Sequence, residues 1–329
     1  MLVSAVLDPY VLDFDDAYFD DLYMINAEDL LNGIKKNGVL IVDSSKKLQN
    51  ALRDRIKSQA FPMKYQKRLQ ILVEELLKNR KRRIVECPIA PNSTLSGDLL
   101  RIACDLKTDT EVDGLIVRNN NFEALRFNPK YSDGIVPLSE YRDSDFEKER
   151  RRYCDGFGPI DMLSRSEVDE IVIRSIRFTK WLRFYDKQIG TGNNTSNFRR
   201  GIAYILSLWK KHGFFLSQQG IGSVEIFTCR DEHIPDDDID DVNRKIDREL
   251  MDPLKKQFPQ WSPINLSVKD DTNGIFHARY LETQHAIIRV DRGFALFKQN
   301  GSFWRNFFTL NMAESSHLRE CRDLPDANL

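Results

Sequence analysis

Three observations in the sequence predict an α/β protein built from two domains. The chain has 329 residues, the length of two ordinary domains, and 41% of them are hydrophobic, enough for a core in each. Short apolar runs typical of strands alternate with segments of helical spacing in both halves. A charged segment that becomes rich in glycine, Ser139–Pro159, separates the halves. We therefore expect one domain over 1–140, a linker over 141–159 and a second domain over 160–329.

The first half has the pattern of a parallel sheet covered by helices. Its apolar runs are short and nearly continuous, as in strands that are buried on both faces. These runs are Leu2–Leu7, Val39–Asp43, Arg82–Cys87 and Gly114–Asn119. The segments between them space apolar residues three or four apart, which predicts helices. These segments are Ala27–Lys36, Ser45–Ser58, Tyr65–Asn79 and Ser96–Asp109.

The second half repeats the alternation of strands and helices. Strands are predicted at Glu170–Ile176, Lys180–Asp186, Ser223–Cys229 and Ile264–Asp271. Two further strands, separated by a turn, are predicted within Gly274–Phe297. Helices are predicted at Phe198–Gly213 and Asp241–Phe258, with Pro253 kinking or ending the second helix. This half is therefore also expected to be α/β.

Composition excludes several classes of protein. The net charge is -1, so nucleic-acid binding would depend on local basic patches. The five cysteines are scattered and contain no CxxC pair, which disfavours a disulfide scaffold or a thiolate zinc site. No apolar run approaches the roughly 20 residues that span a bilayer, and the N-terminus lacks the basic start of a signal peptide. We expect a soluble, cytoplasmic protein.

Carboxylates follow two strands of the first half and start a later helix. Asp8 and Asp43 end strands, Asp98 opens a helix, and Glu74 or Glu75 lies on a helix between. Ligands of α/β sheets gather beyond the carboxyl ends of the strands, and converging carboxylate oxygens would hold Mg²⁺ or Mn²⁺. The alternative is structural, because aspartate is favoured in turns and as a helix cap, Asp43 before the helix at Ser45 above all.

Residues 1–130 resemble the PIN-type nuclease domain. The resemblance rests on AVLDPYVL, where Asp8 takes the place of the first metal carboxylate, and on GDLLRIACDLKTDTEVDGLIVRNNNF, where Asp98 takes the second. It implies a catalytic role for both aspartates through a bound Mg²⁺ or Mn²⁺. The chain departs from the family at Asn119–Asn121, where another aspartate is usual, and an amide is a weaker, uncharged ligand.

Residues 160–310 resemble the phospholipase-D-like superfamily. That superfamily has a histidine nucleophile and a lysine two residues later, followed by an aspartate; here His277 and Arg279 match the pair, and Gln284 replaces the aspartate. A second copy of the motif is absent. The single motif makes the half closer to the phospholipase-D-like domain at the C-terminus of MIT-domain proteins, which is generally regarded as a non-catalytic recognition module. The resemblance implies that His277 attacks phosphorus and Arg279 holds the phosphate.

A single histidine motif leaves two interpretations of the second half. A homodimer would bring two histidines together and complete a catalytic site. Alternatively, His277 is an ordinary strand histidine and Arg279 its solvated neighbour; strand alternation places both on one face in either case.

Basic residues interleaved with aromatic ones predict contacts with phosphates and bases. The segment RSIRFTKWLRFYDK spans Arg174–Lys187, and two arginines downstream of His277 add anion contacts. The predicted phosphate-binding residues are Arg174, Arg177, Lys180, Arg183, Lys187, Arg289 and Arg292. Two further basic clusters are KNRKRR at Lys78–Arg83 and EKERRRY at Glu147–Tyr153. The alternative is that the aromatics belong to the core and the charges to solvated faces.

These features predict a nucleic-acid-processing protein, a nuclease that cleaves phosphodiester bonds in DNA or RNA. The two resemblances suggest prokaryotic defence against mobile elements as its context. The eroded motifs favour a second hypothesis, a non-catalytic module that binds nucleic acid or a protein partner within a larger complex. A third hypothesis is a lipid-headgroup binder, by resemblance to the MIT-associated domain.

Overall fold

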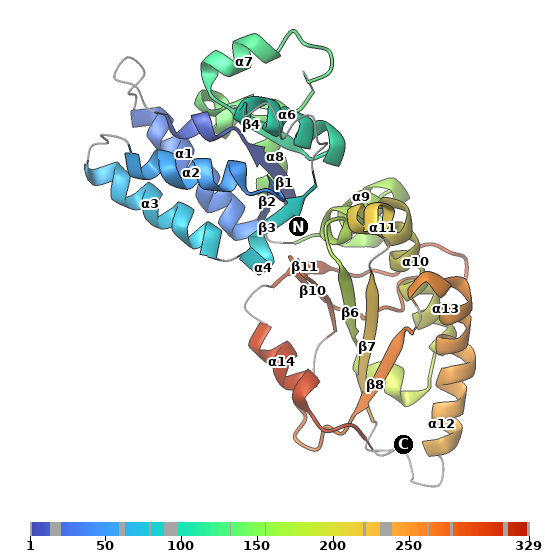
Figure 1. The fold of residues 1–329 in the computed structure, drawn as a ribbon. Coiled ribbons are helices and arrows are strands. Elements are labelled where there is room, and N and C mark those ends of the chain that lie inside the picture. Colours follow the sequence, from blue (N-terminus) through green and yellow to red (C-terminus); the bar gives the residue numbers. More distant parts are fainter. Residues whose placement is uncertain are drawn as a thin grey trace. The chain divides into compact units, whose positions relative to one another are not determined.

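The computed structural model describes residues 2–13, 21–58, 63–78, 80–88, 98–131, 133–154, 156–219, 222–230, 239–261, 263–276, 279–311 and 315–327. The chain forms two compact units, Leu2–Cys154 and 155–329. Each unit has a sheet with helices, so the predicted α/β class is confirmed (Figure 1). The boundary between the units falls within the segment 141–159 that the sequence indicates as a linker.

The N-terminal unit is built on a five-stranded sheet in the order β3-β2-β1-β4-β5, and every neighbouring pair is parallel. Its strands are β1 (Val3–Leu7), β2 (Gly38–Asp43), β3 (Ile84–Cys87), β4 (Gly114–Val117) and β5 (Ile135–Pro137). Every residue of β1, β2 and β4 is buried, as the continuous apolar runs predict. The order reverses between β1 and β4, and their carboxyl ends therefore define the point where α/β sheets bind ligands.

Helices cover this sheet. They are α1 (Asp21–Asn37), α2 (Lys47–Ser58), α3 (Met63–Lys78), α4 (Arg80–Arg83), α6 (Leu99–Thr110), α7 (Asn119–Leu125) and α8 (Asp145–Arg152), with 3-10 helices at Pro9–Leu12 and Leu138–Asp143. Alternate residues of β1 and β2 share one core with α1, α2 and α3. Helix α6 contacts β1, β2 and β4.

Part of the segment indicated as a linker is helical and belongs to the N-terminal unit. Phe146 of α8 is buried in the main core of this unit, beside Tyr141. The basic cluster EKERRRY is partly neutralised there. Glu147 is buried, accepts a 2.6 Å hydrogen bond from the Tyr141 hydroxyl, and forms ion pairs with Arg150 at 2.6 Å and Arg151 at 2.7 Å. These arginines have a structural role.

The C-terminal unit has a mixed six-stranded sheet in the order β11-β10-β9-β6-β7-β8. Its strands are β6 (Trp181–Tyr185), β7 (Ser223–Cys229), β8 (Asn265–Lys269), β9 (Tyr280–Thr283), β10 (Ile287–Val290) and β11 (Phe308–Leu310). Strands β6, β7 and β8 are parallel, whereas β9, β10 and β11 are antiparallel to their neighbours.

The helices of this unit are α9 (Arg165–Ile176), α10 (Thr195–His212), α11 (Phe214–Gln219), α12 (Ile239–Ile246), α13 (Asp252–Gln257) and α14 (Ser315–Asp323). Within the described part of this unit, 3-10 helices lie at Ile160–Met162, Lys187–Thr191 and Pro259–Trp261. A π-helical segment, Asp247–Met251, joins α12 to α13. Pro253 lies in the first turn of α13, where its missing N–H costs least, and the helical path continues through it.

Two predicted strands of this unit are wrong in type or extent. Residues 170–176 belong to helix α9, because Ser164 and Glu167 form a capping box at its start. The strand predicted from Gly274 begins only at Tyr280. Asp271 accepts hydrogen bonds from the backbone N–H groups of Ile275 and Phe276 at 2.6 and 2.7 Å, and this turn takes the chain out of the extended conformation.

Candidate functional site

Asp8 lies at the point where the N-terminal sheet reverses its strand order. It follows β1, and Asn121 lies in the first turn of α7, which follows β4. The amide of Asn121 donates a 2.6 Å hydrogen bond to Oδ2 of Asp8, and the Tyr10 N–H donates to Oδ1 at 3.0 Å. Asp8 is 0% exposed. Each carboxylate oxygen therefore already accepts a hydrogen bond from the protein.

Burial raises the pKa of Asp8 above its ordinary value. Hydrogen bonds from Asn121 and from the N–H groups of Tyr10 and Arg118 oppose this rise, as does attraction by Arg55. The guanidinium of Arg55 lies 3.9 Å from the ring centroid of Tyr10 and pairs with Asp13. The hydrogen-bond donors and the guanidinium around Asp8 thus favour the ionised form of its own carboxylate.

Asp98, the second predicted metal ligand, is the N-cap of α6. Its exposed carboxylate accepts hydrogen bonds from the N–H groups of Leu100 at 3.0 Å and Arg101 at 3.4 Å. Burial raises the pKa of the Cys104 thiol to about 12, and the charges of Asp8, Asp105 and Asp98 contribute to that rise. The negative charges of Asp8 and Asp98 therefore both act on the Cys104 thiol of α6.

The described residues do not form a ready-made site for Mg²⁺ or Mn²⁺. Within the described ranges, no group of three or more His, Cys, Asp or Glu side chains is placed to hold a metal ion. Asp43 is buried and caps α2, accepting hydrogen bonds from the N–H groups of Lys47 at 2.9 Å and Leu48 at 2.8 Å. The metal role of Asp8 and Asp98 stays a prediction.

In the C-terminal unit, His277 lies outside the described residues, so its predicted role as a nucleophile stays untested. Arg279 precedes β9; its Nη1 donates a 2.8 Å hydrogen bond to the carbonyl of Asp291, and its Nε lies 3.6 Å from Oδ1 of Asp186. Gln284, at the position where the resemblance leads one to expect an aspartate, lies in the turn between β9 and β10. Arg279 is therefore held between two segments of the unit.

Asp186 is a buried carboxylate that the sequence reasoning did not single out. It follows β6 and is 0% exposed, and the N–H groups of Gln188 and Phe294 donate to it at 3.0 and 3.1 Å. Burial raises its pKa to about 6, against these hydrogen bonds and the attraction of Arg279. An aspartate that ends a buried strand just before a Gly/Asn-rich loop is the signal that could have found it.

The predicted phosphate-binding residues lie on different elements. Arg174 and Arg177 are at the end of helix α9, whereas Arg183 is in β6, so the segment Arg174–Lys187 does not form one continuous strand. Arg174 donates to Glu170 at 2.8 Å, and Arg183 pairs with Glu225 at 2.5 Å.

The remaining four predicted residues have separate surroundings. The Lys180 ammonium lies 4.5 Å from the ring centroid of Phe215, and Lys187 is half-buried. Arg289 lies 3.4 Å from Asp291 and, like Arg292, is exposed on the β10 side of the sheet. Arg174, Lys180, Arg183 and Arg289 thus contact protein groups, so part of the positive charge predicted for phosphate binding is neutralised or stacked within the fold.

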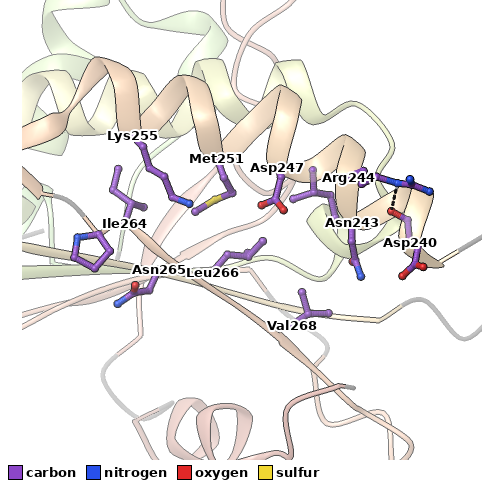
Figure 2. Close-up of a pocket in the computed structure, with 12 residues that line it drawn as sticks. Asp240, Asn243, Arg244, Asp247, Met251, Lys255, Ile264, Asn265, Leu266 and Val268 are labelled. Atoms are coloured by element: carbon purple, nitrogen blue, oxygen red, sulfur yellow. Dashed lines mark hydrogen bonds between the residues drawn. The ribbon is translucent and has the colours of Figure 1, made fainter. Parts of the chain in front are cut away.

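A cavity of about 550 Å³ lies in the C-terminal unit between the α12–α13 helical segment and β8 (Figure 2). Met251 and Lys255 point from the helical side toward the strand, and Leu266 and Val268 come from β8. The π-helical segment lines it through Asp247, and such segments are frequent at functional sites. None of the catalytic, metal-binding or phosphate-binding residues predicted from the sequence lines this cavity.

Comparison with protein-family models, with curated proteins and with solved structures gave no match. The fold therefore defines the class of this protein: two α/β units, the first with a doubly wound parallel sheet and the second with a mixed sheet. In the part of the chain that the structure describes, no helix combines the length and the apolar character needed to cross a membrane.

Proposed function

We propose that this protein is a recognition module that binds the phosphodiester backbone of nucleic acid. A groove between α2 and α3, with a cavity of about 450 Å³, carries this proposal. Its charged lining consists of three cations, Arg53, Lys57 and Lys78, and one carboxylate, Glu74. The excess of positive charge in a concave surface suits a polyanion.

Two cations of this groove, Lys78 and Arg53, make long contacts with protein groups. The Nζ of Lys78 lies 3.7 Å from Glu74, and the Lys78 side chain is 79% exposed. Arg53 makes a long hydrogen bond of 3.5 Å to Asn50. A hydrogen bond from Gln70, with the charges of Lys78 and Lys57, lowers the pKa of Glu74, so one carboxylate stays ionised among the cations. The remaining positive charge is available to phosphates.

The surroundings of Asp8 support binding without hydrolysis. A carboxylate that takes part in metal-ion catalysis needs an accessible oxygen for the ion. Asp8 is fully buried, and Asn121 donates a hydrogen bond to its Oδ2. Asp8 therefore acts as an anchor between the segments that follow β1 and β4.

A second candidate function is phosphodiester cleavage by a nuclease. The position of Asp8 at the reversal of strand order, with Asp98 acting on the same helix, favours it. Cleavage would require Asn121 to turn away so that a divalent ion could reach Asp8. If instead the chemistry belongs to His277, cleavage would be independent of metal ions.

Binding and cleavage can be measured on the same labelled DNA and RNA oligonucleotides, with Mg²⁺, Mn²⁺ or EDTA. We expect salt-sensitive binding and uncut product under all three conditions. The double variant Arg53→Gln/Lys57→Gln should bind about tenfold more weakly and lower the salt slope by about 2 for duplex DNA. Lys67→Gln, an exposed cation of α3 outside the groove, is the matched control.

Three outcomes would contradict the proposal in different ways. Absence of binding by folded protein would overturn nucleic-acid recognition. Cleavage that is lost in EDTA and in Asp8→Ala would establish the metal-dependent nuclease. Cleavage that survives EDTA but is lost in His277→Ala would move the chemistry to the C-terminal unit.

A further inference from the structure

A second cationic surface, in the C-terminal unit, combines arginine with aromatic rings. We name it the arginine–aromatic patch and define it by the cations and rings that compose it: Arg165, Arg200, Lys298, Tyr204, Phe297, Phe303 and Trp304. Arg165, Arg200, Tyr204 and Phe297 line a shallow cavity of about 410 Å³. None of these seven residues was predicted for a site from the sequence.

The guanidinium of Arg165 rests on three rings at once. Its central carbon lies 4.0 Å from the ring centroid of Tyr204 and 4.9 Å from those of Phe297 and Phe303. Asp169 lies 3.2 Å from its Nε and also accepts a 2.5 Å hydrogen bond from the Tyr204 hydroxyl. The guanidinium is thus fixed in position, yet the Arg165 side chain remains 50% exposed.

Arg165 lies at a helix position that disfavours a cation, and its i,i+4 ion pair with Asp169 and its ring contacts offset that cost. It is the first residue of α9, where the positive end of the helix dipole disfavours a cation. Ser164 and Glu167 cap the helix through their own side chains without Arg165. Protein contacts thus hold the guanidinium in place while half of the Arg165 side chain stays exposed, which leaves it accessible to a ligand that stacks on it.

A hairpin over 297–303 supplies the rest of the patch. The rings of Phe297 and Phe303 stack at 5.0 Å, and Arg200 donates a 3.2 Å hydrogen bond to the carbonyl of Lys298. The ammonium of Lys298 lies 5.5 Å from the ring centroid of Trp304, which is 42% exposed. The segment 297–304 therefore presents a cation and a partly exposed indole together.

We propose that the arginine–aromatic patch binds single-stranded nucleic acid, with bases stacked on the Arg165 guanidinium and on Trp304. Unpaired bases have exposed π-faces, and aromatic rings and guanidinium planes bind them with little sequence preference. Arg200 and Lys298 supply the positive charge that the phosphates require. This inference rests on the proposed function and names single strands as the ligand of this surface.

The test measures fluorescence anisotropy of labelled single-stranded DNA and RNA and of duplex DNA, with the full chain over a range of salt. Trp304→Ala should weaken single-strand binding about tenfold, the range of one lost stacking contact. Arg165→Lys keeps the positive charge but removes the planar guanidinium on which a base would stack, so it should weaken single-strand binding about fivefold. Arg200→Gln should lower the single-strand salt slope by about 0.7. Arg319→Gln, an exposed cation of α14, is the matched control and should bind as the wild type does.

The outcomes separate this inference from the proposed function. If the wild type binds no nucleic acid, both fail. If it binds single strands, and the three patch variants bind as tightly as Arg319→Gln, the patch is overturned while the proposed function stands. The inference would also be overturned if the patch variants lost duplex binding and kept single-strand binding. Sedimentation with vesicles of anionic lipid that is lost in these variants, without any effect on oligonucleotides, would assign the patch to a membrane surface instead.

Discussion

At the scale of single residues, the pair formed by Asp8 and Asn121 is where the two candidate functions make different demands on the protein. An amide can donate a hydrogen bond to a buried carboxylate, and here it does so at 2.6 Å. A carboxylate at position 121 would repel Asp8 at that distance unless a proton or a cation lay between them. The amide nitrogen of Asn121 thus lets this side chain hold Asp8 by a hydrogen bond, whereas a carboxylate oxygen in its place would make the two residues a potential pair of metal ligands.

Asn121→Asp should therefore lower the free energy of unfolding in EDTA by about 1–3 kcal/mol at neutral pH, because a hydrogen bond is replaced by repulsion. Millimolar Mn²⁺ should restore part of that loss. Chemical denaturation with and without Mn²⁺ measures both effects. Asn120→Asp, at the exposed neighbouring position, is the control. Equal stability of Asn121→Asp and the wild type in EDTA would show that the contact does not matter.

Asp186 makes stability depend on pH. Burial raises its pKa from 3.8 to about 6, so the folded state holds a proton that the unfolded state releases earlier. The protonated Asp186 therefore contributes about 3 kcal/mol to the free energy of unfolding. This contribution is fully present below about pH 4 and is lost as the pH rises through about 6. The stability of the wild type relative to Asp186→Asn should fall by about this amount between pH 4 and 7.

Denaturation curves across that range measure the difference. Asp161→Asn, at an exposed acid of the same unit, should leave the pH profile unchanged. A flat difference between the wild type and Asp186→Asn would contradict the buried position of this carboxylate.

At the scale of elements, close approach between helix α10 and the chain near β10 requires glycine. A Cβ atom added to Gly201 would lie 1.8 Å from the carbonyl oxygen of Phe294. Because a backbone group cannot move aside as a side chain can, Gly201→Ala should destabilise the protein by about 3 kcal/mol, at the upper end for overpacking. Ser207→Ala, at an exposed position of the same helix, should change stability little. Thermal melting compares the two, and equal melting temperatures would refute the close contact.

The sequence was sufficient for elements whose local pattern agrees with their burial. The apolar runs of β1, β2 and β4 were identified because continuous burial leaves an unbroken apolar pattern. The seven residues of β7 were identified although Ser223 is exposed and Glu225 is only half-buried. Residues 170–176 were assigned to a strand because the apolar residues Ile171, Val172 and Ile173 are β-formers. Their helical state depends on a cap that lies several residues upstream.

The candidate surfaces were harder to predict, because they form between residues distant in the chain. The contact of Asp8 with Asn121 spans 113 positions, and the rings beneath Arg165 come from α10 and a hairpin beyond β10. The sequence was enough to place Asp8 at the end of a strand and Asp98 at the start of a helix. Whether such a carboxylate is accessible or satisfied by the protein depends on packing, which no local pattern records.

At the scale of the whole molecule, the two units have separate sheets and cores. The chain divides into compact units at residues 154 and 155. We therefore expect fragments 1–154 and 155–329 to fold independently, because each keeps its complete sheet and the helices that cover it. Circular dichroism and proton NMR of the two fragments check this. A fragment that stays unfolded while the full chain folds would contradict the division.

The central claim is that the protein binds nucleic acid and leaves it intact, and one experiment tests it most directly. Labelled single-stranded and duplex DNA and RNA are incubated with the wild type, with Asp8→Ala and with His277→Ala, in Mg²⁺, Mn²⁺ or EDTA. Binding is read by anisotropy and cleavage on a denaturing gel. The account predicts salt-sensitive binding with every strand uncut. Cleavage abolished by EDTA and by Asp8→Ala, or by His277→Ala alone, would contradict it, and so would a folded protein that binds none of the four ligands.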